Sequence, residues 1–191
     1  LTGKINDVGA YTRTNIPDSY RMGIELHGSY LLNAKFTLNG NLTLSNNRIK
    51  NFTEYYDDYD NGIQGEIFHG DTYLSYSPAV TALLNLNIRP AKHFEISLPA
   101  RYVSRQYLDN TADKNRSLQA FYNQDVLLSY SIPEKITKNI RLLLQINNLW
   151  NKKYEPNGYT FSYFYGGEMI TENYYFPMAG TNFMFGLNIK L

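Results

Sequence analysis

The chain contains no cysteine and carries little charge. Charged residues make up 18% of its 191 residues, against about 25% in an average globular domain. The absence of cysteine excludes a disulfide framework and a thiolate metal site. The formal net charge of +1 excludes a chain whose main role is nucleic-acid binding, because that role requires a basic stripe and a high pI.

Long apolar runs are also missing. No stretch of about 18 consecutive apolar residues occurs, which excludes a transmembrane helix. The sequence begins at Leu1 without a methionine, a basic n-region or an apolar h-region, so we expect it to be a piece of a longer chain. Aromatic residues are abundant instead, at 15% of the chain with 18 Tyr. Together with the low charge, they exclude disorder.

Period-two alternation of apolar and polar residues runs through most of the chain. In Phe36–Ser45, for example, Phe36, Leu38, Leu42 and Leu44 alternate with Asn and Thr side chains. Such alternation predicts β-strands with one apolar face. Leu1–Ile5 is predicted to be a fragment of an eighth strand, and the seven complete segments are Met22–Leu32, Phe36–Ser45, Val80–Arg89, Phe94–Tyr102, Tyr122–Ile132, Ile140–Asn147 and 182–191.

The segments between these strands are alternately short and long. The short ones lie near residues 33–35, 90–93 and 133–139, and the long ones are Lys50–Tyr73, Leu108–Ala120 and Asn151–Gly180. Short turns at one end and long loops at the other are typical of an outer-membrane barrel. We therefore predict an all-β fold: an antiparallel, up-and-down transmembrane β-barrel segment of about eight strands. Alternation alone also fits a soluble β-sandwich.

The two faces of the predicted strands differ in chemistry. The polar face consists of Asn, Thr, Ser, Gln, Glu and Arg, and burying such groups unpaired in a sandwich costs about 1–3 kcal/mol each. We therefore expect a lumen on this side, where Thr43 lies, and lipid on the other, where Leu128 and Leu144 lie. Aromatic side chains near both ends of the apolar face predict two interface girdles: Tyr30, Phe36, Phe94 and Tyr130 at the short-turn end, and Tyr102, Tyr122 and Trp150 toward the long loops.

Pro99 falls in the middle of a predicted strand. Proline has no N–H to donate to a neighbouring strand. We expect a bulge or a locally broken ladder at this position.

Several segments carry a family resemblance. Arg101–Asn110, Asn147–Tyr154 and Asn157–Phe161 look like the closing stretches of TonB-dependent outer-membrane receptors, particularly the Bacteroidetes-type members. Arg21–Tyr30 is similar to the strand that this family writes as a Gly-Val-Glu-Leu run. The end of the chain resembles the signal recognised by the barrel-assembly machinery, with two departures: the family usually ends in Phe and starts the signal with a polar residue. Here the signal residues are Gly186, Ile189 and Leu191, and Met184 stands at its start.

The resemblance implies a function and a set of partners. In that family a barrel of 22 strands surrounds an N-terminal plug, and TonB supplies energy through a short box on the plug. Residues 1–191 would then be the C-terminal third of the barrel, without the plug. The implied function is import of a scarce nutrient such as an iron chelate, haem or cobalamin across the bacterial outer membrane. The implied partners are outer-membrane lipid, the rest of the barrel and its plug, TonB and the nutrient, with a surface lipoprotein as a further candidate.

Two other functions remain open at this point. Eight strands can close into a small barrel that serves as an anchor or adhesin. A soluble β-sandwich that binds glycans is the other alternative. No nucleophile elbow, phosphate loop or suitably paired carboxylates occur, so we predict no catalytic residue and no cofactor.

Two of the long segments contain candidate ligand-binding residues. Glu54–Gly62 concentrates carboxylates and tyrosines, and Tyr159–Gly167 is rich in aromatic side chains. Rigid aromatic rings offer contact area at low entropic cost. Packing of the loops against each other would use the same residue types. The candidates are Tyr56, Asp58, Tyr59, Tyr163 and Tyr165.

The acidic run before Gly62 raises the question of calcium. Its carboxylates are hard oxygen ligands, but the EF-hand spacing fails. Tyr59 occupies a ligand position, and Phe68 stands where the bidentate Glu belongs. We therefore predict no metal site.

Overall fold

The computed structural model describes residues 4, 16, 18–133 and 140–189. All regular elements in this range are strands, and no helix there is long and apolar enough to span a membrane. The predicted fragment Leu1–Ile5, apart from Lys4, and the terminal Leu191 lie outside the described residues.

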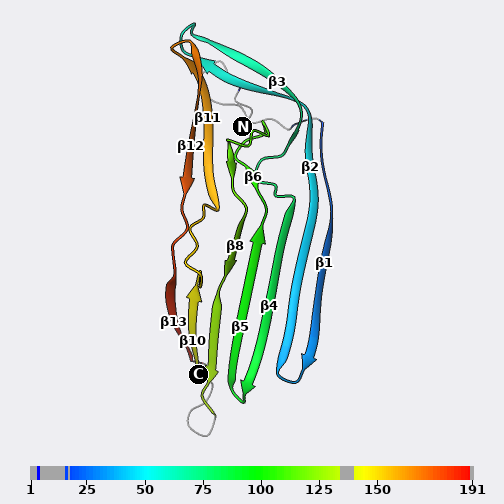
Figure 1. The fold of residues 1–191 in the computed structure, drawn as a ribbon, viewed down its shortest axis with the longest axis vertical. Helices are drawn as coiled ribbons and strands as arrows, with labels where there is room; N and C mark the ends of the chain where they lie inside the picture. Colours follow the sequence, from blue (N-terminus) through cyan, green and yellow to red (C-terminus); the bar gives the residue numbers. More distant parts are fainter. Residues whose placement is uncertain (1–3, 5–15, 17, 134–139, 190–191) are drawn as a thin grey trace.

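One antiparallel wall of strands runs the length of the molecule and curls (Figure 1). Neighbouring members of the wall pair in chain order, and two short strands, β8 (Phe121–Gln124) and β9 (Val126–Ser131), share one position beside β5 (Phe94–Val103). The predicted antiparallel barrel segment is therefore confirmed. Its members are β1 (Ser19–Asn33), β2 (Phe36–Asp58), β4 (Val80–Ala91), β5 (Phe94–Val103), β8 (Phe121–Gln124), β9 (Val126–Ser131), β10 (Ile140–Asn147) and β13 (Asn182–Ile189).

The curled wall is open. Within the described range, β1 is paired only with β2 and β13 only with β10, so the two edges of the wall do not meet. The described residues thus form part of a barrel and do not close into a small one. Unpaired strand edges cannot be satisfied by lipid, so this wall requires further strands in a membrane.

The remaining strands project beyond the wall at the long-segment end. β3 (Ile63–Tyr73) forms a hairpin with the distal half of β2, and β11 (Asn157–Tyr165) forms one with β12 (Glu168–Phe176). Two short strands, β6 (Gln106–Tyr107) and β7 (Ser117–Leu118), bracket a loop between them. In Figure 1 the two hairpins converge at the top of the molecule, with this loop below them.

The prediction that Lys50–Tyr73 and Asn151–Gly180 are loops was wrong. Most of both segments is β-hairpin that extends the wall. The signal for the second hairpin was present in the sequence, because a Gly-Gly pair between alternating side chains favours a tight turn. Gly166 and Gly167 have φ of 67° and 84°, a region that glycine enters without strain.

The two faces of the wall separate apolar from polar side chains as predicted. One apolar row crosses six strands through directly paired residues: Phe36, Ile88, Ile96, Leu128, Leu144 and Phe185. The opposite face is hollowed by a cavity of about 250 Å³ lined largely by polar side chains, among them Thr37, Asn39, Asn87 and Ser97. The polar face is therefore the concave one.

The predicted aromatic rows also lie together in the sheet. Phe94 pairs with Tyr130 at the short-turn end, and Tyr102 pairs with Tyr122 at the other. Trp150 is 65% exposed beside the second row, and its indole Nε1 donates a hydrogen bond to Gln124 Oε1 at 2.9 Å. Each row combines an apolar body with a polar tip, the arrangement that suits a membrane interface.

The expected interruption at Pro99 is present. The β5 ladder with the next strand keeps one register, since Ala100 pairs with Gln124 and Ser97 with Leu127. Asp125, opposite Pro99, separates β8 from β9, although its N–H still donates to the Pro99 carbonyl at 3.0 Å. The ladder is broken without a bulge because only the proline donor is missing.

Asn148 fastens the turn that follows β10. Its side-chain Nδ2 donates to the carbonyls of Lys152 (2.9 Å) and Ala179 (3.1 Å), and its Oδ1 accepts from the Lys152 N–H at 2.9 Å. Only 3% of Asn148 is exposed, and its φ is 51°. This geometry explains why the Asn147–Tyr154 motif has Asn at this position: asparagine tolerates the left-handed region and satisfies three backbone groups.

Replacing Asn148 by alanine should lower the free energy of unfolding by about 1–3 kcal/mol, because buried backbone groups lose their partners. The exposed Asn41 on the polar face is the matched control, and Asn41→Ala should change stability by less than about 0.5 kcal/mol. Urea unfolding of the complete barrel from lipid vesicles measures both. Equal losses would show that Asn148 does not fasten this turn.

Candidate ligand-binding site

The buried apolar residues gather at the hairpin end of the molecule. Four apolar side chains are buried in the described range: Ile49, Leu108, Leu118 and Phe121. They come from β2, from the loop between β6 and β7 and its flanks, and from β8. Phe121 stacks on Tyr154 with ring centroids 4.4 Å apart. This small core anchors the β6–β7 loop to the wall beneath the two hairpins.

The tips of the two hairpins are joined. Asp60 accepts hydrogen bonds from the N–H groups of Gly166 (2.9 Å) and Gly167 (2.8 Å), and the Tyr59 N–H donates to the Phe164 carbonyl at 2.9 Å. The Tyr59 ring lies 5.6 Å from the Tyr163 ring. Residues more than 100 positions apart in the sequence thereby join the tips of the two hairpins. We call these joined tips the roof.

The carboxylate of Asp58 shapes one of these tips. It accepts hydrogen bonds from the side chain and N–H of Asn61 and from the N–H of Asp60, at 2.8–3.1 Å. The Asn61 side chain, with these backbone donors, lowers the pKa of Asp58. The carboxylate of Asp58 is thus hydrogen-bonded within its own turn. Within the described residues, no group of three or more His, Asp or Glu side chains is arranged to hold a metal ion.

Tyr163 and Tyr174 hold a carboxylate on the second hairpin. The Tyr163 hydroxyl donates to Glu172 Oε1 at 2.7 Å, and the Tyr174 hydroxyl donates to Glu172 Oε2. The bonds from Tyr174 and Tyr163 lower the pKa of Glu172, and bonding to Glu172 raises the pKa of each tyrosine. The carboxylate therefore stays ionised, and both phenols stay protonated, at neutral pH.

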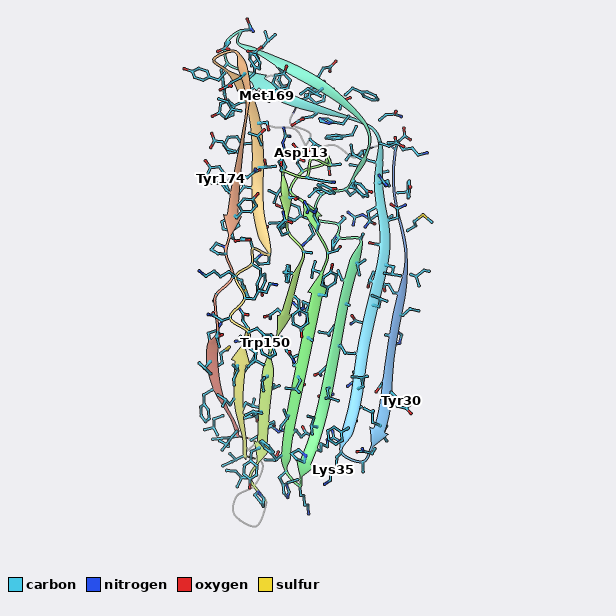
Figure 2. The ribbon with its side chains drawn as sticks, in the orientation of Figure 1. Tyr30, Lys35, Asp113, Trp150, Met169 and Tyr174 are labelled. Atoms are coloured by element: carbon cyan, nitrogen blue, oxygen red, sulfur yellow. The ribbon has the colours of Figure 1, made fainter. Side chains whose placement is uncertain are left out.

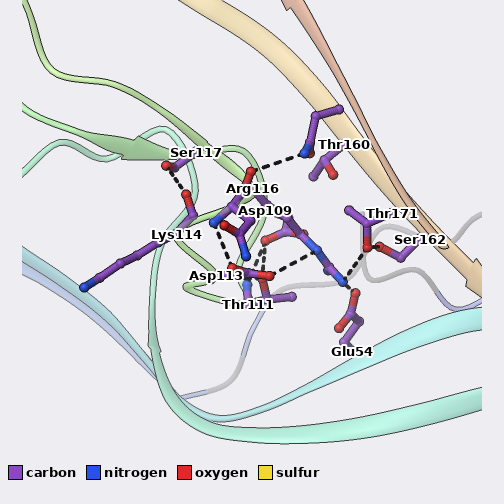
Figure 3. Close-up of polar contacts among 12 residues, drawn as sticks. Glu54, Asp109, Thr111, Asp113, Lys114, Arg116, Ser117, Thr160, Ser162 and Thr171 are labelled. Atoms are coloured by element: carbon purple, nitrogen blue, oxygen red, sulfur yellow. Dashed lines mark hydrogen bonds and ion pairs between the residues drawn. The ribbon is translucent and has the colours of Figure 1, made fainter. Parts of the chain in front are cut away.

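Arg116 connects the β6–β7 loop to β2 and β12 (Figure 3). Its Nη1 forms ion pairs with Glu54 on β2 and with Asp109 (3.1 Å), and its Nη2 donates to Thr171 Oγ1 on β12 at 3.3 Å. The other oxygen of Glu54 lies 2.8 Å from His69 Nε2 on β3. One guanidinium thus ties the loop to both hairpins.

The environment of Arg116 is nearly dry. Its side chain is 8% exposed and that of Glu54 is 12% exposed. Burial lowers the pKa of the guanidinium, but hydrogen bonds and charge attraction from Glu54 and Asp109 outweigh this and raise it. Nε has no hydrogen-bond partner and lies 3.9 Å from Asp113 Oδ2. The guanidinium of Arg116 is therefore held by one carboxylate on β2, that of Glu54, and one in its own loop, that of Asp109.

A cavity of about 510 Å³ lies below the roof. Its wall comes from β2, β11, the β6–β7 loop and the segment after β3, and it includes Phe52, Glu54, Tyr56, Tyr76, Leu108, Asp109, Thr160 and Ser162. Aromatic surface and a few converging polar groups are typical of small-molecule sites. The volume falls within the range of about 300–1,000 Å³ that is usual for pockets that bind small molecules.

The structure divides the five predicted ligand-binding residues into three groups. Tyr56 lines the cavity, and its ring lies over Gly65 of β3. Asp58, Tyr59 and Tyr163 belong to the hairpin tips and their contacts. Tyr165 is 59% exposed at the tip and does not line the cavity. The alternative that aromatic residues pack these segments together describes Tyr59 and Tyr163, whose rings lie side by side, while Asp58 is bonded within its own turn.

Arg116 is the residue that sequence reasoning missed. It lies in a polar loop with no periodicity, and its partner Glu54 is 62 positions away. The nearby Asp109 and Asp113 were a local hint of charge pairing. Nothing in the sequence pointed to Glu54 or Thr171 as the other contacts.

A comparison with protein families decides the identity of this wall. The model of the TonB-dependent receptor-like β-barrel matches residues 2–149. The chain belongs to the TonB-dependent receptor β-barrel family. Receptors of this family are outer-membrane transporters and not enzymes, which confirms the predicted location and the absence of catalysis. The comparison with curated proteins gave no match.

Solved structures share the fold. The siderophore receptor PiuA from Acinetobacter baumannii superposes with a TM-score of 0.68 at 16% identity, covering 88% of this chain and 21% of that one. The closed form of the ferric-catecholate import receptor Fiu from E. coli K12 gives 0.59 at 18% identity, covering 95% and 22%. The ferric yersiniabactin uptake receptor FyuA from Yersinia pestis gives 0.53 at 16%, covering 88% and 23%.

The chain spans less than a quarter of the length of each of these receptors. At such identities the likeness concerns the fold alone. Family membership nevertheless removes the soluble β-sandwich, and the unpaired edges of the wall do not support the stand-alone closed barrel.

Proposed function

We propose that residues 1–191 are the C-terminal part of the barrel of a TonB-energised receptor that imports a scarce nutrient, such as an iron chelate, haem or cobalamin. The remaining strands and the plug would then lie elsewhere in the complete chain. Three of the similar structures are siderophore or ferric-chelate receptors by name, which makes an iron chelate the first candidate.

The observation that carries this proposal is the roofed cavity on the long-segment side. At the opposite end, the described turns are short, such as the one between β1 and β2. A cavity of about 470 Å³ lies there too, but its charged side chains, among them Lys35, Arg89 and Lys92, replace the aromatic surface of the roofed cavity. The cavity combines Tyr56, Phe52 and Tyr76 with polar groups of the loop. In an outer-membrane receptor, the long-segment end of the wall, where the roofed cavity lies, faces the outside of the cell.

The five predicted residues take different roles in this proposal. Tyr56 contacts the ligand directly. Asp58, Tyr59 and Tyr163 keep the roof closed above it, and Tyr165 meets the ligand only on its way in. A surface lipoprotein would have to bind on this same side, whereas TonB would act from the periplasm through the plug.

The end of the chain fits recognition by the barrel-assembly machinery. Gly186 and Ile189 lie in β13, opposite Leu143 and Ile140 of β10. We propose that they form the assembly signal together with Leu191.

Uptake experiments with the complete receptor test this function. Cells that depend on the receptor are given iron-55 as a ferric tricatecholate or a ferric trihydroxamate, and in parallel haem or labelled cobalamin. At least one probe should accumulate, and an uncoupler that collapses the proton gradient should abolish its uptake. Accumulation of none of the four probes, or uptake that survives the uncoupler, would contradict the proposal.

Tyr56→Ala should weaken binding of the transported probe at least tenfold, which corresponds to about 1.4 kcal/mol. Tyr165→Ala removes the same side chain from the exposed tip and should change binding less than twofold. Deleting the segment Tyr159–Gly167 would not test ligand binding, because the deletion removes most of strand β11. Equal effects of the two substitutions would show that the cavity is not the binding site.

A further inference from the structure

The charged side chains that line the roofed cavity are all acidic. They are Glu54, Asp57 and Asp109, and among the described residues that line the cavity none is Lys, Arg or His. Asp57 lies near the distal end of β2, where its Oδ1 accepts a hydrogen bond from Gln64 Nε2, a neutral donor, at 3.1 Å. The part of the cavity wall that this chain supplies is therefore acidic.

The buried guanidinium of Arg116 does not cancel this charge. Arg116 pairs with Glu54 and Asp109, and Asp113 Oδ2 lies 3.9 Å from its Nε. Figure 3 shows these carboxylates around the one guanidinium. Three carboxylates thus share a single cation, and Asp57 is a fourth carboxylate at the same cavity.

The acidic lining belongs to the hairpin end and not to the chain as a whole, whose net charge is +1. The cavity at the short-turn end is lined by cationic side chains, among them Lys35, Arg89 and Arg141, while Glu95 is the one carboxylate among its described lining residues. Figure 2 shows Lys35 and Asp113 at opposite ends of the molecule. The fold therefore gathers negative charge beside the roofed cavity.

Aromatic rings form much of the same wall. The faces of such rings attract cations. One ring of this cavity already has a cation beside it, since Lys4 Nζ lies 5.9 Å from the centre of the Tyr55 ring. Adding Lys4 and a protonated His69 to Arg116 gives three cations against the four carboxylates. Six lining residues are aromatic: Phe52, Tyr55, Tyr56, Tyr76, Tyr159 and Phe161.

The charge of an iron chelate depends on the groups that bind the iron. Three catecholate dianions around a ferric ion leave a complex with three negative charges, whereas three hydroxamate anions leave a neutral complex. A linear trihydroxamate that ends in an amine adds one positive charge, because an alkylammonium group stays protonated at neutral pH. Like charges on a ligand and its site oppose binding, so an acidic wall discriminates among these chelates.

We propose that the roofed cavity binds a ferric chelate that bears a cationic group, such as an amine-terminated ferric trihydroxamate, and disfavours ferric tricatecholates. The ammonium group would lie between the aromatic rings and Asp57, and the body of the chelate would pack on Tyr56. This inference rests on the proposed import function and names the chemical class of its ligand.

Equilibrium binding to the complete receptor in detergent tests the charge preference with two matched ligands. One is the iron-55 complex of an amine-terminated linear trihydroxamate, and the other is the same complex with its amine acetylated, which removes the positive charge. The first should bind about tenfold more tightly than the second. The ferric tricatecholate should bind more weakly than both, and raising the salt concentration should reduce the preference.

Asp57→Asn removes one negative charge from the lining with little change of shape. It should lower the preference for the amine-terminated chelate by about threefold and leave binding of the acetylated chelate within about twofold. Asp71→Asn is the matched control, because Asp71 is an exposed carboxylate on β3 of the same hairpin and does not line the cavity. This control should leave the preference unchanged.

The outcomes separate the charge preference from the import function. Equal binding of the two trihydroxamates, tighter binding of the tricatecholate, or equal preferences in the two variants would overturn the charge preference and leave the import function intact. Transport of haem or cobalamin alone would do the same. Uptake of none of these probes would overturn both. Heat-modifiable gel mobility checks that each variant barrel is assembled, and the comparison of the two trihydroxamates on the wild type requires no variant.

Discussion

Replacing Arg116 by alanine should open the loop cluster at a cost of about 3–5 kcal/mol, because it leaves the carboxylates of Glu54 and Asp109 in a nearly dry site without their cation. The effect should appear as faster amide hydrogen exchange across the loop, beginning with the Leu108 N–H, which now donates to the Arg116 carbonyl at 2.9 Å. The barrel strands should exchange as before.

The chain provides a matched control for this substitution. Arg89 pairs with Glu95 at 2.8 Å, but the two side chains are 68% and 49% exposed. Arg89→Ala should therefore cost less than about 1 kcal/mol. Arg116→Lys should fall between the two, because lysine keeps the charge but cannot reach Glu54, Asp109 and Thr171 with one planar fork. Slow exchange of the Leu108 amide in Arg116→Ala would mean that the apolar core alone holds the loop.

Arginine placed at Leu144 should destabilise the membrane-inserted barrel by about 2–4 kcal/mol. Leu144 sits in the apolar row between Leu128 and Phe185, so an arginine there would meet the hydrocarbon core. Leu128→Arg should behave in the same way. Reversible urea unfolding of the complete barrel in liposomes gives both values.

Thr43→Arg is the comparison on the concave face. Thr43 lies between Glu25 of β1 and Thr81 of β4, so an arginine there would have water and a carboxylate within reach. The cost should be less than about 1 kcal/mol. If Thr43→Arg proves the more destabilising of the two, the assignment of the lipid and lumen faces is reversed.

The candidate site was only partly predictable. The richness of the two segments in Tyr and Asp was visible, and Tyr56 indeed lines a cavity. Composition could not distinguish the role of Tyr56 from that of Tyr59, because the two differ only in their tertiary contacts. Tyr56 lines the cavity, whereas the ring of Tyr59 packs against Tyr163 of the other hairpin. The Gly-Gly turn signal at Gly166 was available and would have corrected the loop assignment.

The sequence by itself determined the strands of the wall, their two faces and the family. Strand Ile140–Asn147 has the predicted bounds, and most other wall segments differ from prediction only at their ends. The exceptions are β2, which continues past the predicted Ser45 to Asp58, and Tyr122–Ile132, which is divided into β8 and β9. The reason is physical: alternation is a local property, and a strand that separates lipid from water must repeat it at every second residue.

Only the tertiary structure decided how the hairpin end is built. The bonds from Gly166 and Gly167 to Asp60 join residues 106 and 107 positions apart, and Arg116 reaches Glu54 across 62. Such contacts depend on how far the hairpins extend past the wall and on how strongly the wall curls. Neither property leaves a repeating pattern in the sequence, because each is set by the packing of elements that are distant along the chain.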